Sequence, residues 1–198
     1  MRITLLDLGV GNLHSLEKAL AAATNAEVVV ETDVSRALDG ELVVLPGVGA
    51  FTPAATRLAS FRGEIRKALA DGFPCIGVCL GMQLLFESSE EGEGDGIGLV
   101  PGRVTKLATA RTPHMGWSPV RPAPHAPAWP WPRAVYYAHS FACRAERQED
   151  VLATTTLEGD TFPAVVRHAN TVGCQFHPEK SSAEGVALLG TIVREVTT

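Results

Sequence analysis

Short apolar runs alternate with helical patterns through the first half of the chain, and this alternation limits the fold more than any other feature. Four runs have the length and apolar character of buried strands, namely residues 3–8, 28–30, 42–45 and 75–78. Helical spacing follows three of them: a helix that starts at an N-cap Asn12, one over 61–70 that Gly72 ends, and one over 80–86. Strands and helices in this order predict βαβ units and a parallel sheet.

The second half has a different character. Strands are expected at residues 135–138, 151–156, 164–167 and 171–176, with a hairpin turn at 168–170, and a last helix at 183–196. Seven of the 13 prolines and all three Trp residues lie within 113–132, which predicts an irregular but ordered segment. We therefore predict one three-layer α/β domain over residues 1–198. It would have a mostly parallel central sheet, helices on both faces and an antiparallel extension in the C-terminal half.

Composition argues against several classes of protein. The 17 Lys and Arg and the 22 Asp and Glu give a net charge of −5 without a basic stripe, so we expect no binding to nucleic acid. No apolar run approaches the ~20 residues that span a bilayer, and Asp7 interrupts the first one, so we expect a cytoplasmic protein without a membrane segment. The four cysteines are too dispersed for a disulfide framework and lack the spacing of zinc ligands, so we expect no metal site.

The sharpest local motif is Gly77-Val78-Cys79-Leu80-Gly81, between a predicted strand and a predicted helix. This is the pattern of a nucleophile elbow with Cys in place of Ser. Glycines on both sides allow a strained turn to close, and the start of a helix favours a thiolate. The backbone N–H of Leu80 would then face an oxyanion on a substrate. The alternative is a buried cysteine at a glycine-rich strand end.

A thiolate needs a base, and six histidines are candidates: His14, His114, His125, His139, His168 and His177. His177 differs from the others because it directly follows a predicted strand and opens His177-Pro178-Glu179. In an extended segment, residues two apart point the same way, so Glu179 would reach the imidazole. Cys79, His177 and Glu179 would then form a triad of nucleophile, base and orienting carboxylate.

Three further features have both a functional and an ordinary interpretation. The glycines of Pro46-Gly47-Val48-Gly49 would present amides to an anion, or form an ordinary turn. Gln83 lies one turn after Cys79 and would contact a substrate or satisfy nearby backbone. The acidic run 87–95 would be a solvated loop, or one of its carboxylates would meet a substrate ammonium group.

The motifs around Cys79 and His177 resemble those of the class I, or triad, glutamine amidotransferases. The resemblance extends in order along nearly the whole chain, through residues 7–15, 45–49, 79–87, 114–118, 136–141 and 175–181. It is closest to the glutaminase subunits that work with a (β/α)8-barrel cyclase. Residue 118 is a departure, because it is Ser where that group usually has Asn.

The resemblance implies roles for particular residues. Cys79 would attack the side-chain amide of glutamine, His177 would transfer the proton, and Glu179 would orient His177. The amides of Val48 and Leu80 would form the oxyanion hole, Val48 only after a peptide flip in the loop 46–49. Glutamine would be held by Gly47, Gly49, Gln83, Glu91, Ser140 and Phe141. Trp117, Ser118, Tyr136 and Lys180 would lie at the interface with the cyclase, and no cofactor is implied.

A partner is also expected on chemical grounds. The sequence contains no second group of residues that would consume ammonia, so another polypeptide is needed to use it. The resemblance implies that this partner is the barrel cyclase, in a heterodimer, and that the isolated subunit is nearly inactive. The alternatives are a glutaminase that serves a different ammonia-accepting synthase, a Cys-elbow peptidase on the same scaffold, and a module that binds a partner without catalysis.

Overall fold

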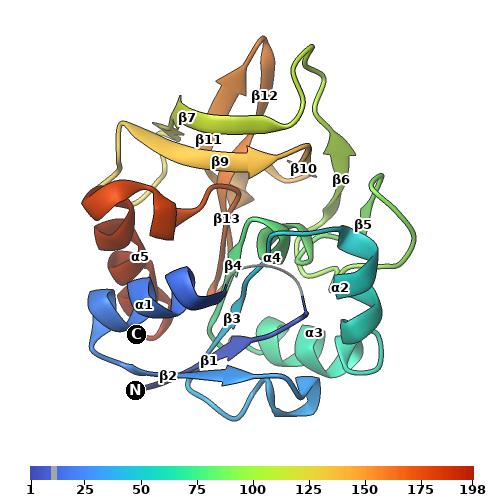
Figure 1. Ribbon diagram of the computed structural model, residues 1–198, viewed down its shortest axis with the longest axis vertical. Coiled ribbons are helices and arrows are strands. Elements are labelled where there is room, and N and C mark those ends of the chain that lie inside the picture. Colours follow the sequence, from blue (N-terminus) through green and yellow to red (C-terminus); the bar gives the residue numbers. More distant parts are fainter. Residues whose placement is uncertain (10–12) are drawn as a thin grey trace.

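The computed structural model describes residues 1–9 and 13–198 and is built around an eight-stranded sheet (Figure 1). The strands lie in the order β2 (Glu27–Glu31), β1 (Arg2–Leu6), β3 (Leu42–Leu45), β4 (Cys75–Val78), β13 (Thr171–Cys174), β12 (Asp160–His168), β11 (Val151–Leu157) and β8 (Arg121–Pro122). The pairs from β2 to β13 are parallel, and those from β13 to β8 are antiparallel. The predicted mostly parallel sheet with an antiparallel extension is confirmed.

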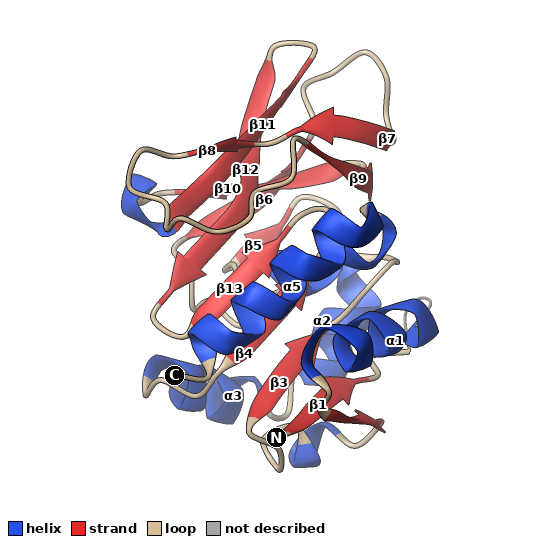
Figure 2. Cartoon of the chain, turned by 90° about the vertical axis from the view of Figure 1, so that its left-hand side faces the viewer, coloured by secondary structure: helices blue, strands red, loops and turns tan. Residues whose placement is uncertain are grey.

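The parallel strands are buried on both faces, which is why they read as continuous apolar runs. In β3, Leu42 and Val44 belong to one hydrophobic cluster, while Val43 and Leu45 belong to another. The first cluster includes apolar residues of α1 (Leu13–Thr24) and α5 (Ser182–Val196), and the second those of α2 (Phe51–Leu58) and α3 (Arg62–Ala70). Helices therefore cover both faces, and Figure 2 shows α1 and α5 together on one of them.

Two smaller sheets lie at one end of the central sheet. This is the end toward which β12 extends furthest, at the top of Figure 1. One contains β10 (Phe141–Ala145), β6 (Gly102–Lys106) and β5 (Ser88–Ser89). The other is a two-stranded ribbon of β7 (His114–Pro119) and β9 (Ala134–His139). The remaining elements are α4 (Leu80–Gln83) and the 3-10 helices η1 (Val34–Arg36), η2 (Gln148–Asp150) and η3 (Pro178–Lys180).

Several elements differ from their predictions. The segment 113–132, expected to be irregular, contains β7 and β8, because β7 finds a partner in β9. The helix expected over 80–86 ends at Gln83, because the carbonyls of Leu84 and Phe86 accept hydrogen bonds from Ile97 and Gly98. The sequence did not predict α2, β5, β6 or β10, and the expected N-cap Asn12 lies outside the described residues.

None of the helices within residues 1–9 and 13–198 is both long enough and apolar enough to cross a membrane. The longest of them, α5, has 15 residues. It packs on α1 and on the central sheet rather than standing apart from the fold.

Candidate functional site

Cys79 occupies a strained turn between β4 and α4. Its φ of 52° and ψ of −105° are unusual for a residue with a side chain. A Cβ at Gly77 would lie 2.7 Å from the carbonyl carbon of Gly81, and one at Gly81 would lie 1.8 Å from the carbonyl oxygen of Leu45. The turn therefore closes only with glycine at both positions, which is the physical reason for the G-x-C-x-G pattern.

His177 and Glu179 lie just beyond the end of β13. Nδ1 of His177 is 2.9 Å from Oε1 of Glu179, and both side chains are buried. The segment is not extended as expected, because Pro178 begins η3 and this 3-10 turn brings Glu179 back to the imidazole. Within the part of the chain that the structure describes, Nε2 of His177 has no hydrogen-bond partner. A buried polar atom without a partner is costly, and here it leaves this nitrogen available to exchange a proton.

The three side chains of the expected triad meet at neighbouring strand ends. β4 and β13 pair in parallel, and the Cys79 amide donates to the Cys174 carbonyl at 2.7 Å, so the end of β13 lies beside the elbow. Burial lowers the pKa of His177, but the Cys79 sulfur and the Glu179 carboxylate outweigh burial and raise this pKa to about 9. An imidazolium next to a sulfur is the arrangement that favours a thiolate nucleophile.

A pocket of about 290 Å³ opens beside the sulfur of Cys79. Its lining includes five of the six expected glutamine-binding residues: Gly49, Gln83, Glu91, Ser140 and Phe141. The sixth, Gly47, is buried and instead lines a small crevice next to His177, Glu179 and Lys180. A concave site of this size, with a few polar groups near a nucleophile, suits a small polar substrate.

In the loop 46–49, the carbonyl group of Gly47 points into the expected oxyanion site. The Leu80 amide donates to the Gly47 carbonyl at 3.3 Å, so one expected oxyanion donor is already engaged. Because a trans peptide holds its C=O and N–H on opposite sides, the Val48 N–H points away from Leu80. Gly47 and Gly49 have φ values of 156° and 151°. Gly47, at one end of this peptide, gives it the freedom to rotate, and Gly49 lets the backbone that follows adjust.

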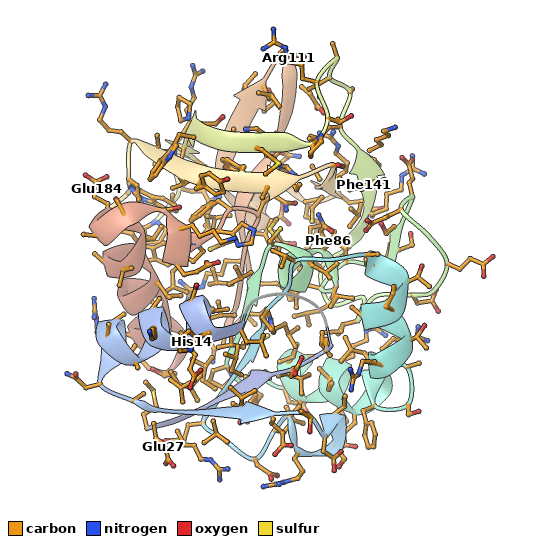
Figure 3. All side chains as sticks on the ribbon, viewed as in Figure 1. His14, Glu27, Phe86, Arg111, Phe141 and Glu184 are labelled. Atoms are coloured by element: carbon orange, nitrogen blue, oxygen red, sulfur yellow. The ribbon has the colours of Figure 1, made fainter. Side chains whose placement is uncertain are left out.

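The polar lining of the pocket is held by side-chain bonds. Nε2 of Gln83 donates to the Phe141 carbonyl at 2.9 Å, and Phe141 lies above Phe86 in Figure 3. Oε2 of Glu91 accepts from the Phe51 amide at 2.9 Å, at the start of α2. The other acids of the run 87–95 are exposed, so Glu91 alone of that run reaches the pocket among the described residues.

Two residues of this region are given no place at the site by the sequence-based prediction, although His139 is among the six candidate bases. Gln175 is fully buried, and its Nε2 lies 3.7 Å from the Cys79 sulfur. His139 lines the pocket, and burial lowers its pKa to about 4, so it is a neutral imidazole near pH 7. The only sequence signal for either residue is its place at a strand end, which many residues share.

The four residues expected at a partner interface fall in different surroundings. Trp117 is 55% exposed on β7, and its ring packs edge-on against that of Tyr136, which is partly buried on β9. Lys180 is exposed on η3. Ser118 is only 7% exposed, and its hydroxyl lies 2.8 Å from Nε2 of His114. Its side chain therefore lies behind the exposed face of the ribbon.

The four cysteines are all buried as free thiols. Among residues 1–9 and 13–198, no three His, Cys, Asp or Glu side chains are grouped so as to hold a metal ion. Burial raises the pKa of the Cys174 thiol to about 12 and also raises that of Cys75. These two thiols are therefore poor nucleophiles.

Comparisons with known proteins agree with this geometry. The profile of the family described as "Glutamine amidotransferase class-I" matches residues 4–193. A protein of Salinibacter ruber named "Imidazole glycerol phosphate synthase subunit HisH" is 42% identical, over 98% of this chain and 95% of the relative. A protein of Pyrococcus furiosus with the same name is 39% identical, over 95% of this chain and 96% of the relative.

Solved structures show the same fold. One glutamine amidotransferase structure superposes with a TM-score of 0.76 at 19% identity and covers 99% of both chains. Another glutamine amidotransferase, from Thermotoga maritima, has a TM-score of 0.74 at 15% identity, over 100% of this chain and 98% of that one. At these identities the likeness is one of fold.

Proposed function

The chain belongs to the class-I glutamine amidotransferase family, and from this premise we propose that it is the glutaminase subunit of an imidazole glycerol phosphate synthase. It hydrolyses L-glutamine to glutamate and ammonia and passes the ammonia to a cyclase subunit. That partner makes imidazole glycerol phosphate and aminoimidazole carboxamide ribotide in histidine biosynthesis, in the cytoplasm. The observation that carries the proposal is the meeting of Cys79, whose side chain lines the pocket, with the buried His177–Glu179 pair. Residues 1–198 form one such domain in this proposal.

The triad divides the reaction into two steps. The Cys79 thiolate attacks the side-chain amide carbon of glutamine, and a carbon–sulfur bond forms. Nε2 of the His177 imidazolium then gives its proton to the leaving nitrogen, so that ammonia departs and a thioester remains. The neutral imidazole next takes a proton from water, which attacks the thioester and releases glutamate. Glu179 holds Nδ1–H throughout and stabilises the imidazolium.

The oxyanion of each tetrahedral intermediate needs two backbone donors, the amides of Leu80 and Val48. The Gly47 carbonyl now accepts from Leu80, so this conformation is a resting state. Rotation of the Gly47–Val48 peptide would release the Leu80 amide and turn the Val48 N–H inward. Binding of the cyclase subunit would favour the rotated state, and the isolated chain is therefore expected to hydrolyse glutamine slowly.

Glutamine would bind with its side-chain amide at Cys79 and its charged end toward the far wall of the pocket. Glu91 is the half-buried carboxylate on that wall and would pair with the α-ammonium group. The other expected contacts are made by Gly47, Gly49, Gln83, Ser140 and Phe141. Gly47 acts through the loop, since its own position is behind the pocket.

The partner is proposed to be a (β/α)8-barrel cyclase that forms a heterodimer with this chain. Trp117 and Tyr136 offer an aromatic surface on the outer face of the β7–β9 ribbon, and Lys180 adds a charge on η3. Ammonia would leave near this surface. No cofactor is proposed.

The substitution Cys79→Ala in the reconstituted complex tests the proposal. Formation of imidazole glycerol phosphate from glutamine should stop, while formation from added ammonium should continue at the wild-type rate. Cys75→Ala removes a buried thiol at the other end of β4 and should retain both activities. Loss of the ammonium-dependent activity in Cys79→Ala would contradict the division of labour between the subunits.

A further inference from the structure

Gln175 is a buried amide whose two polar atoms both point into the site. It is the first residue after β13, and its backbone N–H donates to the Ala164 carbonyl, which fixes it beside the antiparallel strand β12. Its side chain is fully buried. Nε2 lies 3.7 Å from the Cys79 sulfur, and Oε1 lies 3.4 Å from Nε2 of Gln83.

A backbone carbonyl fixes which end of each amide faces which partner. The Phe141 oxygen only accepts hydrogen bonds, so the atom of Gln83 that lies 2.9 Å from it must be the nitrogen. That same nitrogen faces Gln175, so Gln175 must turn its oxygen toward Gln83. The amide nitrogen of Gln175 is then the atom left to face the Cys79 sulfur. The orientation therefore follows from the hydrogen-bond chain and does not depend on distinguishing oxygen from nitrogen by position.

We propose that Gln175 is a further active-site residue, whose side-chain amide donates a hydrogen bond to the sulfur of Cys79 and holds it in place for attack. A thiolate accepts such a bond more strongly than a thiol, so the bond favours the nucleophilic form. The amide stays neutral throughout the reaction and gives up no proton. It supports the nucleophile while His177 remains free to transfer the proton.

Gln83 would then serve two purposes. It lines the glutamine pocket, and it also orients the amide of Gln175 from the side opposite the sulfur. The pocket wall and the nucleophile are connected in this way through two side chains. The contribution of Gln175 to catalysis rests on the proposed function, whereas its hydrogen bond to the sulfur does not.

Other groups that titrate also face Cys79 and must be kept constant in a test. His177 approaches from the turn after β13, with Glu179 behind it, and Cys143 approaches from β10. His139 lies on the same pocket wall and interacts with His177. All four remain in the variants below, so a difference between variants reports on the amide.

The test is the pH dependence of alkylation of Cys79 by iodoacetamide in the full chain, with the modified residue located by mass spectrometry. Gln175→Met keeps the length of the side chain and removes the donor. Its midpoint for alkylation should move upward by about 1 pH unit, because loss of a hydrogen bond to the thiolate disfavours ionisation. In the complex, the same variant should lower kcat for glutamine more than it changes KM.

A matched control and a second variant keep the test decisive. Gln148→Met makes the same substitution at an exposed position in η2 and should leave the midpoint unchanged. Gln83→Met keeps Gln175 but removes the group that orients its amide, and should shift the midpoint in the same direction by a smaller amount.

A folded Gln175→Met with the wild-type midpoint would overturn the proposal. If Gln175→Met does not fold, an unchanged midpoint in Gln83→Met would overturn it instead. Glutamine-dependent activity that survives Cys79→Ala would refute the proposed function and leave the alkylation result standing.

Discussion

The elbow around Cys79 depends on two glycines whose missing side chains let three backbone segments approach one another. A Cβ at Gly81 would meet the Leu45 carbonyl oxygen at 1.8 Å, and backbone cannot move aside as a flexible side chain can. Gly63, exposed in the first turn of α3, has nothing within 4 Å of the corresponding position. Gly81 and Gly63 therefore differ in physical role although they are the same residue type.

This contrast gives a prediction at the residue scale. Gly81→Ala should lower the free energy of unfolding by about 3 kcal/mol or more, because it forces a shift in β3. Gly63→Ala should raise it by about 0.4–1 kcal/mol, because alanine loses less conformational freedom on folding than glycine at a position where nothing obstructs the new side chain. Urea unfolding of both variants measures the two changes. Equal effects would refute close backbone packing as the reason for the G-x-C-x-G pattern.

The His177–Glu179 pair predicts how stability changes with pH. The pKa of His177 is raised to about 9 in the folded chain, so its contribution is fully present below pH 6.5 and is lost as the pH rises toward 9. The free energy of unfolding should therefore fall by about 2 kcal/mol between pH 6.5 and 8.5. Glu179→Gln removes the negative charge that stabilises the imidazolium, so the free energy of unfolding should fall less over this pH range.

Denaturant unfolding across that range, on wild type and Glu179→Gln, measures the difference. Near the top of that range the thiols of Cys75, Cys143 and Cys174 also begin to ionise in the unfolded chain, but they do so equally in both proteins, so the difference between the two profiles reports on the pair. His14→Gln is a control, because that histidine is exposed on α1. Identical pH profiles for wild type and Glu179→Gln would contradict the assigned pairing.

For single residues, the sequence predicted which side chains carry the chemistry better than it predicted the backbone conformation that brings them together. The elbow and the His177–Glu179 pair both follow from local spacing, since each depends on residues within two positions of one another. The 3-10 turn at Pro178 was not expected, although it brings the same two groups together. Gln175 could not be assigned, because its role depends on Phe141 and Gln83, which are distant in sequence and close only in the fold.

At the scale of elements, the β7–β9 ribbon connects the exposed face to the pocket through neutral histidines. The Phe141 carbonyl accepts from Nδ1 of His139 at 2.8 Å, so Nε2 of His139 must accept from Nδ1 of His114, 3.1 Å away. Nε2 of His114 then accepts from the Ser118 hydroxyl. The donors therefore all point in one direction, from Ser118 toward the wall of the pocket.

Ser118→Ala should break this chain at its outer end. It leaves Nε2 of His114 without its donor in a buried place, which costs about 1–3 kcal/mol of stability. The pocket wall at Phe141 would be held less firmly, so KM for glutamine should rise while ammonium-dependent activity is unchanged. Ser118→Thr retains the hydroxyl and should keep KM near the wild-type value. A normal KM in Ser118→Ala would show that the chain does not support the pocket.

The elements that the sequence missed share a physical cause. The helix α2 begins at Phe51 without a side-chain cap from its own N-cap residue, and its first amide is satisfied by Glu91, 40 positions away. Likewise, β7 contains Gly116 and ends at Pro119, so it becomes a strand through its pairing with β9. Elements whose hydrogen bonds are supplied by distant segments leave little trace in local spacing.

At the scale of the whole molecule, the site follows from the order of strands in the sheet. Cys79 and His177 are far apart along the chain, but each follows a strand, and β4 and β13 are parallel neighbours. The carboxyl ends of such strands lie at one edge, which is where α/β proteins commonly bind ligands. The sequence predicted both strand ends but not that these two strands would be adjacent, since adjacency is set by how the helices cover the two faces.

The same edge carries the exposed aromatic surface of the ribbon, and this makes a prediction about assembly. Trp117 is 55% exposed, so Trp117→Ala should leave the stability of the isolated chain nearly unchanged. A large aromatic side chain buried on binding often contributes about 2 kcal/mol or more, so affinity for the cyclase subunit should fall by about 30-fold. Titration calorimetry with the purified partner measures this change. Val30→Ala is the control, because Val30 is also exposed but lies on β2, at the opposite end of the molecule (Figure 1). An unchanged dissociation constant for Trp117→Ala, with weakened binding for Val30→Ala, would move the interface to the other end of the sheet.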